Sequence, residues 1–329
     1  MCRVHASLFL LCLGVGGMQP ALAQTSCAAD PDKLGVARTI VIDAASGPRY
    51  GSRFGEKYSD LTILADREVW LTFDDGPLRG HTKSILDTLA AHCTKATFFM
   101  LGRMALADPG MVKEVARQGH TVASHTWSHA NLQKQTPIEG QVEIEMGLSA
   151  VRYALGKPIA PFFRFPFVRD TEPTLSYVRS RGLATFGIDI DTRDFETKDA
   201  AVLSERVLSD VTARRKGIIL LHDIHAVTAA ALPSILTGLK ERGFKVVHVT
   251  AKAPAETLPH YDELTRQEVE RLRLAALQQP LSKRAPFWST RIFSEADADS
   301  ATPKAQPSAP SPPARNGAAN AAPPSAVQP

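Results

Sequence analysis

The stretch LTFDDGP, residues 71–77, follows an apolar, β-branched run and places two carboxylates side by side, Asp74 and Asp75. Neighbouring acids repel each other, and buried acids are costly to ionise. One interpretation is a turn whose acids point into water. The other is a site where one acid binds a metal and the other handles a proton. Successive strand residues face opposite sides, but Gly76 and Pro77 favour a turn that brings both acids to the rim.

From this stretch onward, apolar runs alternate with helical patterns. The candidate strands are residues 69–73, 96–101, 120–124, 162–166, 184–190, 217–222 and 245–249. Amphipathic segments such as TKSILDTLAAH and AVLSERVLSDVTARR lie between them. This alternation predicts an α/β fold with a parallel sheet and helices outside it. Seven strands indicate a barrel one unit short of the usual eight, and an open doubly wound sheet has the same pattern.

The composition of the 329-residue chain is globular, with 44% hydrophobic and 22% charged residues. This length allows one large α/β domain or two smaller ones. The net charge of +4 is small and no dense Lys/Arg block occurs, so no nucleic-acid partner is expected. A Walker loop and a GxGxxG pattern are absent.

The first 23 residues predict a signal peptide. Arg3 precedes the apolar segment ASLFLLCLGVGGM, and the ALA that ends at Ala23 is a cleavage site. A helix needs about 20 apolar residues to span a bilayer, and this apolar segment is shorter. We therefore expect a secreted or periplasmic protein without a stable membrane span. An uncleaved anchor is the alternative. Cleavage leaves Cys27 and Cys93, which either form one disulfide or stay free thiols.

The rest of the chain divides by composition. Residues 24–65 are a polar N-terminal extension, and residues 66–250 carry the alternating pattern. Residues 251–296 form a C-terminal extension with a helix from about 262 to 278. Residues 297–329 are rich in Ala, Pro and Ser and predict a disordered tail, with a tether to envelope material as the alternative.

Two histidines follow the third predicted strand, in SHTWSH. His125 and His129 are four residues apart, and on a helical turn this spacing stacks both imidazoles on one face. They are expected to face the acids, because the carboxyl ends of parallel strands gather at one edge. Two histidines and one carboxylate leave open positions for water and substrate, as in zinc sites. We predict Asp75, His125 and His129 as metal ligands and Asp74 as the base that deprotonates metal-bound water.

The later strand ends supply the remaining groups. Arg164 lies in the apolar run FFRFPF and needs a carboxylate partner, for which Asp74 is the acid without a ligand role. The proline before Phe167 fixes the backbone, so the Phe167 N–H can point at a developing oxyanion. His222 ends a long apolar run and is predicted to protonate the departing nitrogen, with Asp194 orienting its other ring nitrogen. A third metal ligand or a core histidine are the alternatives for His222.

Together these stretches resemble the NodB-type polysaccharide deacetylases of carbohydrate esterase family 4, over roughly residues 66–250. TFDDGP and HTWSH resemble the first two motifs of the family, and RFPF, DTRDF and LLH resemble the next three, in the family's order. The resemblance implies a distorted (β/α) barrel of about seven parallel strands that removes acetyl groups, usually from N-acetylglucosamine residues. It implies Zn²⁺ or another divalent ion such as Co²⁺, and an acetylated polysaccharide or oligosaccharide as substrate.

Carried over by position, the resemblance implies roles for eight residues of the site. Asp74 is the base and His222 the acid, supported by Arg164 and Asp194. Asp75, His125 and His129 are the metal ligands, and Leu220 lines the pocket for the acetyl methyl group.

The sequence departs from the family pattern in two places. Phe167 and Val168 stand where the family often has Tyr-Gly, which affects a backbone donor and need not abolish it. Phe195 stands where the family usually has Trp. The loss of an indole from the groove wall leaves the glycan preference open.

Other functions share part of this pattern. An O-acetyl esterase acting on xylan uses the same metal and base. Non-haem Fe(II) oxygenases also bind iron with two histidines and one carboxylate. A non-catalytic glycan-binding module would use Trp127 and the phenylalanines. The spare Asp74 and the distal His222 favour hydrolysis over the last two.

Overall fold

The computed structural model describes Cys27, residues 33–51 and residues 63–278. The predicted signal peptide (1–23) and tail (297–329) lie outside the described residues. The described strands are β1 (Arg38–Ile42), β2 (Arg49–Tyr50), β3 (Glu68–Asp74), β4 (Thr97–Met100), β5 (Thr121–Ser124), β6 (Phe162–Phe163), β7 (Ala184–Phe186), β8 (Ile190–Asp191), β9 (Gly217–His222) and β10 (Lys245–Ala251).

The described α-helices are α1 (Arg79–Ala91), α2 (Gly102–Ala107), α3 (Pro109–Arg117), α4 (Pro137–Leu155), α5 (Glu172–Ser180), α6 (Ala200–Arg214), α7 (Ala226–Glu241) and α8 (Pro259–Gln278). The described residues also form three short 3-10 helices, η1 (Leu132–Lys134), η2 (Pro166–Val168) and η3 (Asp194–Glu196). Within these described segments, no helix combines the length and the apolar character needed to cross a bilayer.

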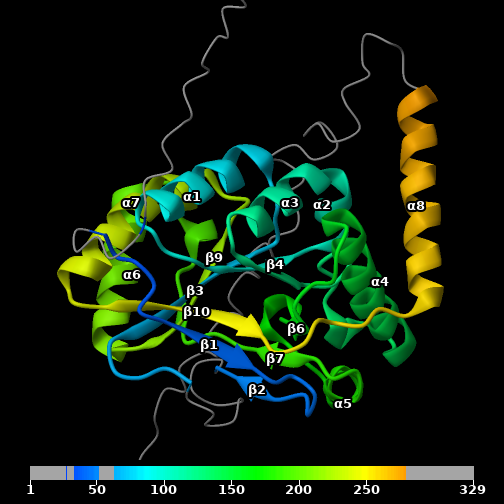
Figure 1. Ribbon diagram of the computed structural model, residues 1–329, viewed down its shortest axis with the longest axis horizontal. Coiled ribbons are helices and arrows are strands. Elements are labelled where there is room, and N and C mark those ends of the chain that lie inside the picture. Colours follow the sequence, from blue (N-terminus) through cyan, green and yellow to red (C-terminus); the bar gives the residue numbers. More distant parts are fainter. Residues whose placement is uncertain (1–26, 28–32, 52–62, 279–329) are drawn as a thin grey trace, which may run out of the picture.

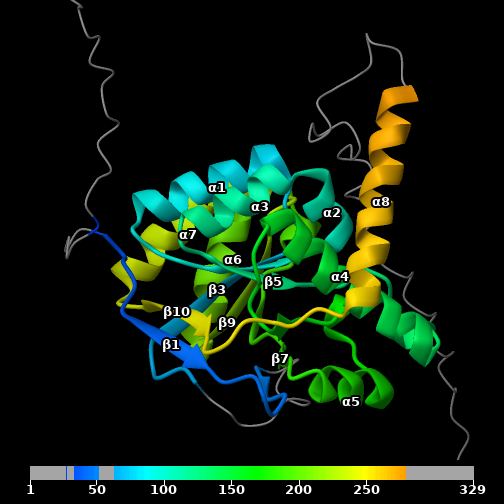
Figure 2. The same ribbon diagram turned by 45° about the vertical axis from the view of Figure 1, so that its right-hand side comes forward.

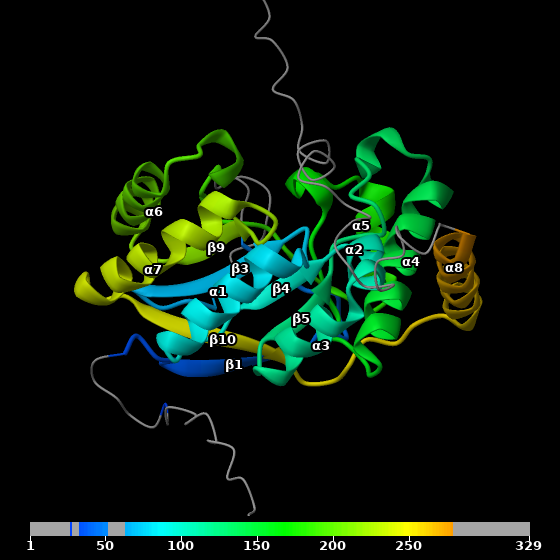
Figure 3. The ribbon, with the colours of Figure 1, turned by 90° about the horizontal axis from the view of Figure 1, so that it is seen from above.

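The strands form one parallel sheet. Hydrogen-bonded neighbours follow the order β1-β10-β3-β4-β5-β6-β7-β2, and β9 pairs with β3 and β8. Since β9 takes one edge of β3, β10 and β4 share the other edge. Helices lie outside the strands (Figures 1 and 3), and α8 lies beside α4 at the periphery (Figure 2). The predicted α/β fold with parallel strands is confirmed, and the arrangement is that of a distorted barrel.

Two predicted strands differ from the structure by more than one or two residues at their ends. The segment 162–166 pairs only at Phe162 and Phe163, because Pro166 has no N–H to donate and begins η2. The segment 184–190 is two strands rather than one, because the chain changes its partner from β6 to β9 between β7 and β8. Both differences reflect pairing partners, which an apolar run does not reveal.

Alternate side chains along a strand point into two different hydrophobic clusters. In β3, Val69, Leu71 and Phe73 pack in the cluster that contains the helices' apolar residues, whereas Trp70 packs in a second cluster inside the barrel. Four aromatic side chains dominate the inner cluster, and we call them the aromatic plug: Trp70, Phe99, Phe162 and Phe186. The ring centroids of the first three lie 4.9, 5.8 and 4.9 Å from that of Phe186. The plug fills the barrel below its carboxyl end.

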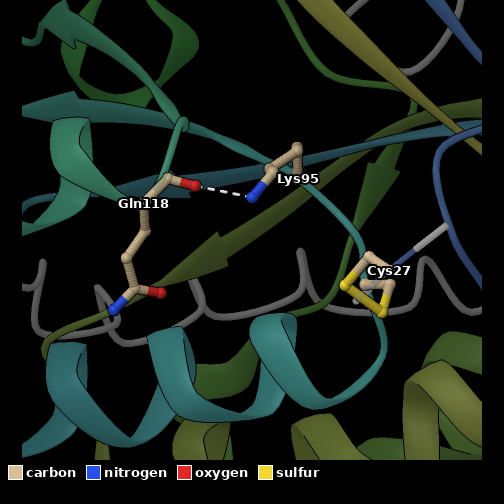
Figure 4. The surroundings of a disulfide bond; sticks show 4 residues. Cys27, Lys95 and Gln118 are labelled. Carbon is tan, nitrogen blue, oxygen red and sulfur yellow. Dashed lines mark hydrogen bonds between the residues drawn. A yellow bond between two sulfur atoms is a disulfide. The ribbon is translucent and has the colours of Figure 1, made fainter. Parts of the chain in front are cut away.

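A disulfide joins Cys27 to Cys93, which lies in the turn between α1 and β4 (Figure 4). Of the two states that the sequence left open, the structure has the bonded one. The Cα atoms are 5.4 Å apart, near the usual value for a disulfide. Next to it, Lys95 Nζ donates to the Gln118 carbonyl at 2.5 Å and links the approach to β4 with the approach to β5.

The disulfide is expected to stabilise the fold substantially. It closes a loop with a sequence separation of 66 residues. In the chain-entropy description this restricts the unfolded chain and contributes roughly 4 kcal/mol. We expect Cys93→Ser to lower the free energy of unfolding by about that amount, measured by denaturant titration. Reduced wild-type protein is the control and should match the variant, and equal stability of oxidised and reduced protein would contradict the expectation.

His120 lies directly before β5 and is buried, and its ring centroid is 5.4 Å from that of Phe98 in a T-shaped arrangement. The Ala96 N–H donates to its Nδ1 at 3.2 Å, so the neutral ring suits this position. Burial, assisted by the charge of Lys95, lowers the pKa of His120 from 6.5 to about 3. The folded protein therefore resists protonation of this histidine.

This burial predicts a loss of stability in acid. Between pH 6.5 and about 3, the unfolded chain binds a proton at His120 that the folded chain does not. The free energy of unfolding therefore falls as the pH falls, by at most about 1.4 kcal/mol per pH unit from this group. His120→Asn keeps an acceptor for the Ala96 N–H but does not titrate, so its stability should depend less steeply on pH. Denaturant unfolding at several pH values between 4 and 8 measures both slopes, and identical slopes would refute the assignment.

Candidate active site

The sequence-predicted site residues gather at the carboxyl end of the sheet. Asp74 ends β3 and His222 ends β9, while His125 directly follows β5 and Arg164 directly follows β6. These strands are parallel, so their ends open at the same mouth of the barrel. Groups that are far apart along the chain therefore meet in one place.

Arg164 lies inside the barrel, on top of the aromatic plug. Its guanidinium carbon is 4.3 Å from the centroid of the Phe99 ring, and the residue is fully buried. Nη1 donates to Asp74 Oδ1 at 2.7 Å and to Thr72 Oγ1 at 2.9 Å, and Nη2 donates to the Gly187 carbonyl at 3.1 Å. A buried charge is tolerated when it is paired and hydrogen-bonded. The predicted pairing of Arg164 with Asp74 is therefore present.

Asp75 lies in a turn that directly follows β3 at the mouth of the barrel. Its φ is +74°, in the left-handed region that a non-glycine residue adopts at a cost of about 1–3 kcal/mol. In an extended strand, Asp74 and Asp75 would point to opposite faces. The turn at Asp75 instead directs both carboxylates toward His125, whose Nε2 lies 3.7 Å from Asp74 Oδ2 and 3.5 Å from Asp75 Oδ1.

His125 and His129 do not lie on a helical turn, so that part of the prediction is wrong. Residues 125–131 are an irregular loop in which His129 has a φ of +65°. The Glu143 carboxylate on α4 holds the loop by accepting hydrogen bonds from the Ser128 N–H at 2.9 Å and Ser128 Oγ at 2.7 Å. The two imidazoles still meet, with centroids 5.1 Å apart, because the loop folds back on itself.

Asp75, His125 and His129 fit a divalent metal ion. Both histidine Nε2 atoms lie 3.5 Å from Asp75 Oδ1, and ligands around a tetrahedral zinc ion are about 3.4 Å apart. Asp75 Oδ1 is buried and has no hydrogen-bond partner among the described residues. His125 Nδ1 donates to the Arg164 carbonyl at 2.7 Å, which leaves its Nε2 lone pair free for a ligand role.

The electrostatics of this group also suit a metal. Burial raises the pKa of Asp75, but the nearby histidines outweigh burial and the net shift is downward. Burial lowers the pKa of His129 to about 4, although the charge of Asp75 opposes this shift. At neutral pH the carboxylate is therefore ionised and the imidazole neutral, which are the forms that bind metal ions.

His222 faces this group from β9. Its Nε2 lies 4.0 Å from Asp75 Oδ2, and its Nδ1 donates to Asp194 Oδ1 at 2.7 Å. Asp194 Oδ2 accepts from the His222 N–H at 2.8 Å and from Thr228 Oγ1 at 2.6 Å. Burial lowers the pKa of His222, but the charge and hydrogen bond of Asp194, with the charges of Asp75 and Asp74, outweigh it and raise the pKa to about 10. The upward shift of this pKa favours the protonated imidazole.

A second set of side chains also has the spacing of metal ligands: Asp194, His222 and His225. Both oxygens of Asp194 already accept hydrogen bonds, and His222 Nδ1 is one of the donors. A metal ion there would have to displace the proton between Asp194 and His222. The geometry therefore favours the proton-holding pair at this position.

The three predicted substrate contacts surround the same mouth. Leu220 packs with Val168 and Ile188 in a small apolar cluster. Phe167 has a φ of +58° in η2, and its ring is 4.6 Å from that of His129. A further aromatic contact, between Phe195 and His222, has a centroid separation of 6.2 Å, and 41% of the Phe195 residue surface is exposed.

Three residues that shape the site were not predicted: Thr72, Glu143 and Thr228. Thr72 precedes Asp74 by two residues, so strand periodicity places both on the same face and was a usable signal. Glu143 and Thr228 lie on helices far along the chain from the groups that they hold. Nothing local in the sequence indicates their contacts.

Comparison with known proteins gives concordant matches. Residues 63–186 match the family described as polysaccharide deacetylase. The chain is 36% identical over 184 residues to the peptidoglycan-N-acetylglucosamine deacetylase PgdA of Listeria monocytogenes, covering 56% of this chain and 38% of that protein. It is 31% identical over 205 residues to a chitooligosaccharide deacetylase of Bradyrhizobium sp., covering 57% of this chain and 91% of that protein.

A solved structure shows the same fold. The peptidoglycan deacetylase of Bdellovibrio bacteriovorus superposes with a TM-score of 0.59 at 32% identity, covering 66% of this chain and 59% of that chain. The present chain spans only 38% of the length of the Listeria relative, so the similarity concerns one part of that protein.

The buried ion pair predicts a specific stability effect. Arg164→Met leaves Asp74 buried without its partner, so we expect the free energy of unfolding to fall by about 3–5 kcal/mol. Adding Asp74→Asn should recover part of this loss, because the uncompensated charge is then gone. Denaturant titration of both single variants and the double variant measures the coupling. Strictly additive losses would show that the pair does not stabilise the mouth of the barrel.

Proposed function

The chain belongs to the NodB-homology polysaccharide deacetylases, carbohydrate esterase family 4, and on this premise we propose that it hydrolyses acetyl groups from N-acetylglucosamine-type glycans. The observation that carries the proposal is the convergence of Asp75, His125 and His129, with Asp74 and His222 beside them, at one mouth of the barrel. Relatives are named for peptidoglycan and for chitooligosaccharides, and the proposed substrate belongs to this class.

The ion in this proposal is Zn²⁺ or another divalent ion such as Co²⁺, held by Asp75, His125 and His129. When bound, such an ion lowers the pKa of water toward about 7 and polarises a carbonyl. The buried Asp75 Oδ1, without a hydrogen-bond partner among the described residues, supports this assignment.

Asp74 acts as the general base in the proposed mechanism. Arg164 binds its Oδ1, so only Oδ2 faces the ligand group, where it takes a proton from the attacking water. The oxygen of that water forms a bond to the acetyl carbonyl carbon. The backbone N–H of Phe167 stabilises the negative charge that develops on the carbonyl oxygen, and the apolar cluster around Leu220 receives the methyl group.

His222 acts as the general acid. Its Nδ1 is bound to Asp194, so the proton that it donates comes from Nε2, which faces Asp75. Transfer of this proton to the nitrogen accompanies cleavage of the carbon–nitrogen bond and releases acetate and a free amine. The raised pKa of His222 supports the role, since a protonated donor is needed at neutral pH.

Export from the cytoplasm is part of the same proposal. The predicted signal peptide provides the route, and the Cys27–Cys93 disulfide supports an oxidising compartment. An acetylated cell-envelope or environmental glycan would be accessible there.

A product assay tests the proposal. Zn²⁺- or Co²⁺-loaded protein is incubated with peptidoglycan, chitin oligomers and acetyl-xylan, and both acetate and free amine are quantified. We expect amine and acetate in equal amounts from a glucosamine-based substrate, and loss of activity with a chelator. Release of acetate from acetyl-xylan alone would instead indicate an O-acetyl esterase. Activity that resists chelation would refute the metal's role.

Two variants separate the metal from the base. His125→Ala removes a ligand, so it should lose metal binding and turnover together. Asp74→Asn keeps the ligand set and the shape of the side chain, so it should bind one equivalent of Co²⁺ while kcat falls by roughly 10²–10⁴-fold. Isothermal titration with Co²⁺ and the product assay measure the two effects. Full kcat in Asp74→Asn would show that another group is the base.

A further inference from the structure

The turn that carries Asp75 is clamped at successive peptide groups. The Asp74 carbonyl accepts from the Asp223 N–H at 3.4 Å, and the Asp75 N–H donates to the Phe99 carbonyl at 3.2 Å. The Gly76 carbonyl accepts from the N–H of the residue that follows β4, Leu101, at 3.3 Å. Neighbouring strand ends therefore hold the turn on two sides. Such support is needed because Asp75 has a positive φ, which costs energy for a non-glycine residue.

Side-chain hydrogen bonds also link the turn to the β9–α7 loop. The Leu78 N–H, at the start of α1, donates to Thr82 Oγ1 at 2.9 Å. Thr82 Oγ1 in turn donates to Asp223 Oδ2 at 2.6 Å. Asp223 directly follows His222 in the β9–α7 loop. We call the pair Thr82 and Asp223 the brace, because it ties the loop of the predicted acid to the loop of the predicted metal ligand.

The Asp223 carboxylate packs directly on Gly76. A Cβ atom at position 76 would lie 2.2 Å from both Asp223 oxygens, so no other residue fits there without moving the carboxylate. The glycine that the sequence offered as a turn former is required here for space. This contact fixes the peptide immediately after Asp75.

Burying the Asp223 carboxylate in this position costs free energy. It is buried beside two other acids, and its Oδ1 has no hydrogen-bond partner among the described residues. Burial raises its pKa to about 7, and the charges of Asp75 and Asp74 act in the same direction, although the Thr82 hydrogen bond opposes them. A buried acid that is only partly satisfied calls for an explanation. Its contacts point to the turn rather than to the reacting atoms.

We propose that Asp223 and Thr82 are positioning residues that hold Asp75 in its left-handed conformation and thereby set the affinity of the Asp75–His125–His129 group for a divalent ion. The inference rests on the proposed metal-binding function of that group. Residues that orient a ligand typically change metal affinity by about 10–100-fold when they are replaced. Because the brace acts through the backbone, the lower end of that range is expected.

The test measures the Kd for Co²⁺ by isothermal titration of the metal-free protein. Thr82→Val removes the hydroxyl and keeps the shape, and we expect its Kd to rise by about tenfold. Thr82→Ser keeps the hydroxyl and should restore the Kd to within about twofold of the wild type. An unchanged Kd in Thr82→Val, or an equal loss in both variants, would overturn the proposal.

A matched variant separates positioning from general stability. Ile85→Val truncates a buried side chain one helical turn further along α1, without touching the brace. It should lower the unfolding temperature of the metal-free protein and leave the Co²⁺ Kd unchanged. A Kd that rises in Ile85→Val as much as in Thr82→Val would show that the effect is only structural.

Asp223→Asn provides a second route, which also serves if Thr82→Val does not fold. Asparagine keeps the shape and an acceptor for Thr82 but removes the charge. The positioning role predicts a Co²⁺ Kd within about threefold of the wild type for Asp223→Asn and about tenfold above it for Asp223→Ala, which removes the acceptor for Thr82 and the contact with Gly76. Equal Kd values in the two variants, or a tenfold or larger rise in Asp223→Asn, would refute the brace. Failure of the wild-type protein to bind Co²⁺, or unchanged binding in His125→Ala, would instead contradict the proposed function.

Discussion

The buried pair of Arg164 and Asp74 is the constraint on which the site depends. A guanidinium inside a barrel filled with aromatic rings is tolerated only if its donors are satisfied, and Asp74, Thr72 and the Gly187 carbonyl satisfy them. The same contacts fix which oxygen of Asp74 faces the mouth. The buried aromatic plug supports the guanidinium from below through the ring of Phe99. Core packing and the chemistry proposed for Asp74 are therefore parts of one arrangement.

The adjacent aspartates have different surroundings although they share one turn. Asp74 keeps its strand conformation and is held by Arg164, whereas Asp75 adopts a positive φ and faces two histidines. Strand geometry alone would have separated the two carboxylates across the sheet. The strained turn brings them together, and neighbouring strand ends and the brace oppose that strain. Local strain is sustained here by the surrounding tertiary structure, as is typical of functional sites.

Each remaining group of the site is held by a partner from a distant part of the chain. Asp194 holds His222, Glu143 holds the loop of His129, and the Arg164 carbonyl fixes the ring of His125. These partners orient side chains that the mechanism proposed above requires in one rotamer and one tautomer. The precision of the site thus comes from the helices and loops around the mouth as much as from the strands.

The sequence by itself determined the parallel α/β architecture and the candidate residues, because strand periodicity and the order of strand ends are local patterns. It did not determine where β6 ends, that residues 184–190 form two strands, or that His125 and His129 lie on an irregular loop. Those features depend on pairing partners and on contacts such as Glu143 with Ser128. Thr82 and Asp223 likewise meet only in the folded chain, 141 residues apart. Spacing along a chain encodes which face a residue occupies, whereas only folding decides which distant residue it meets.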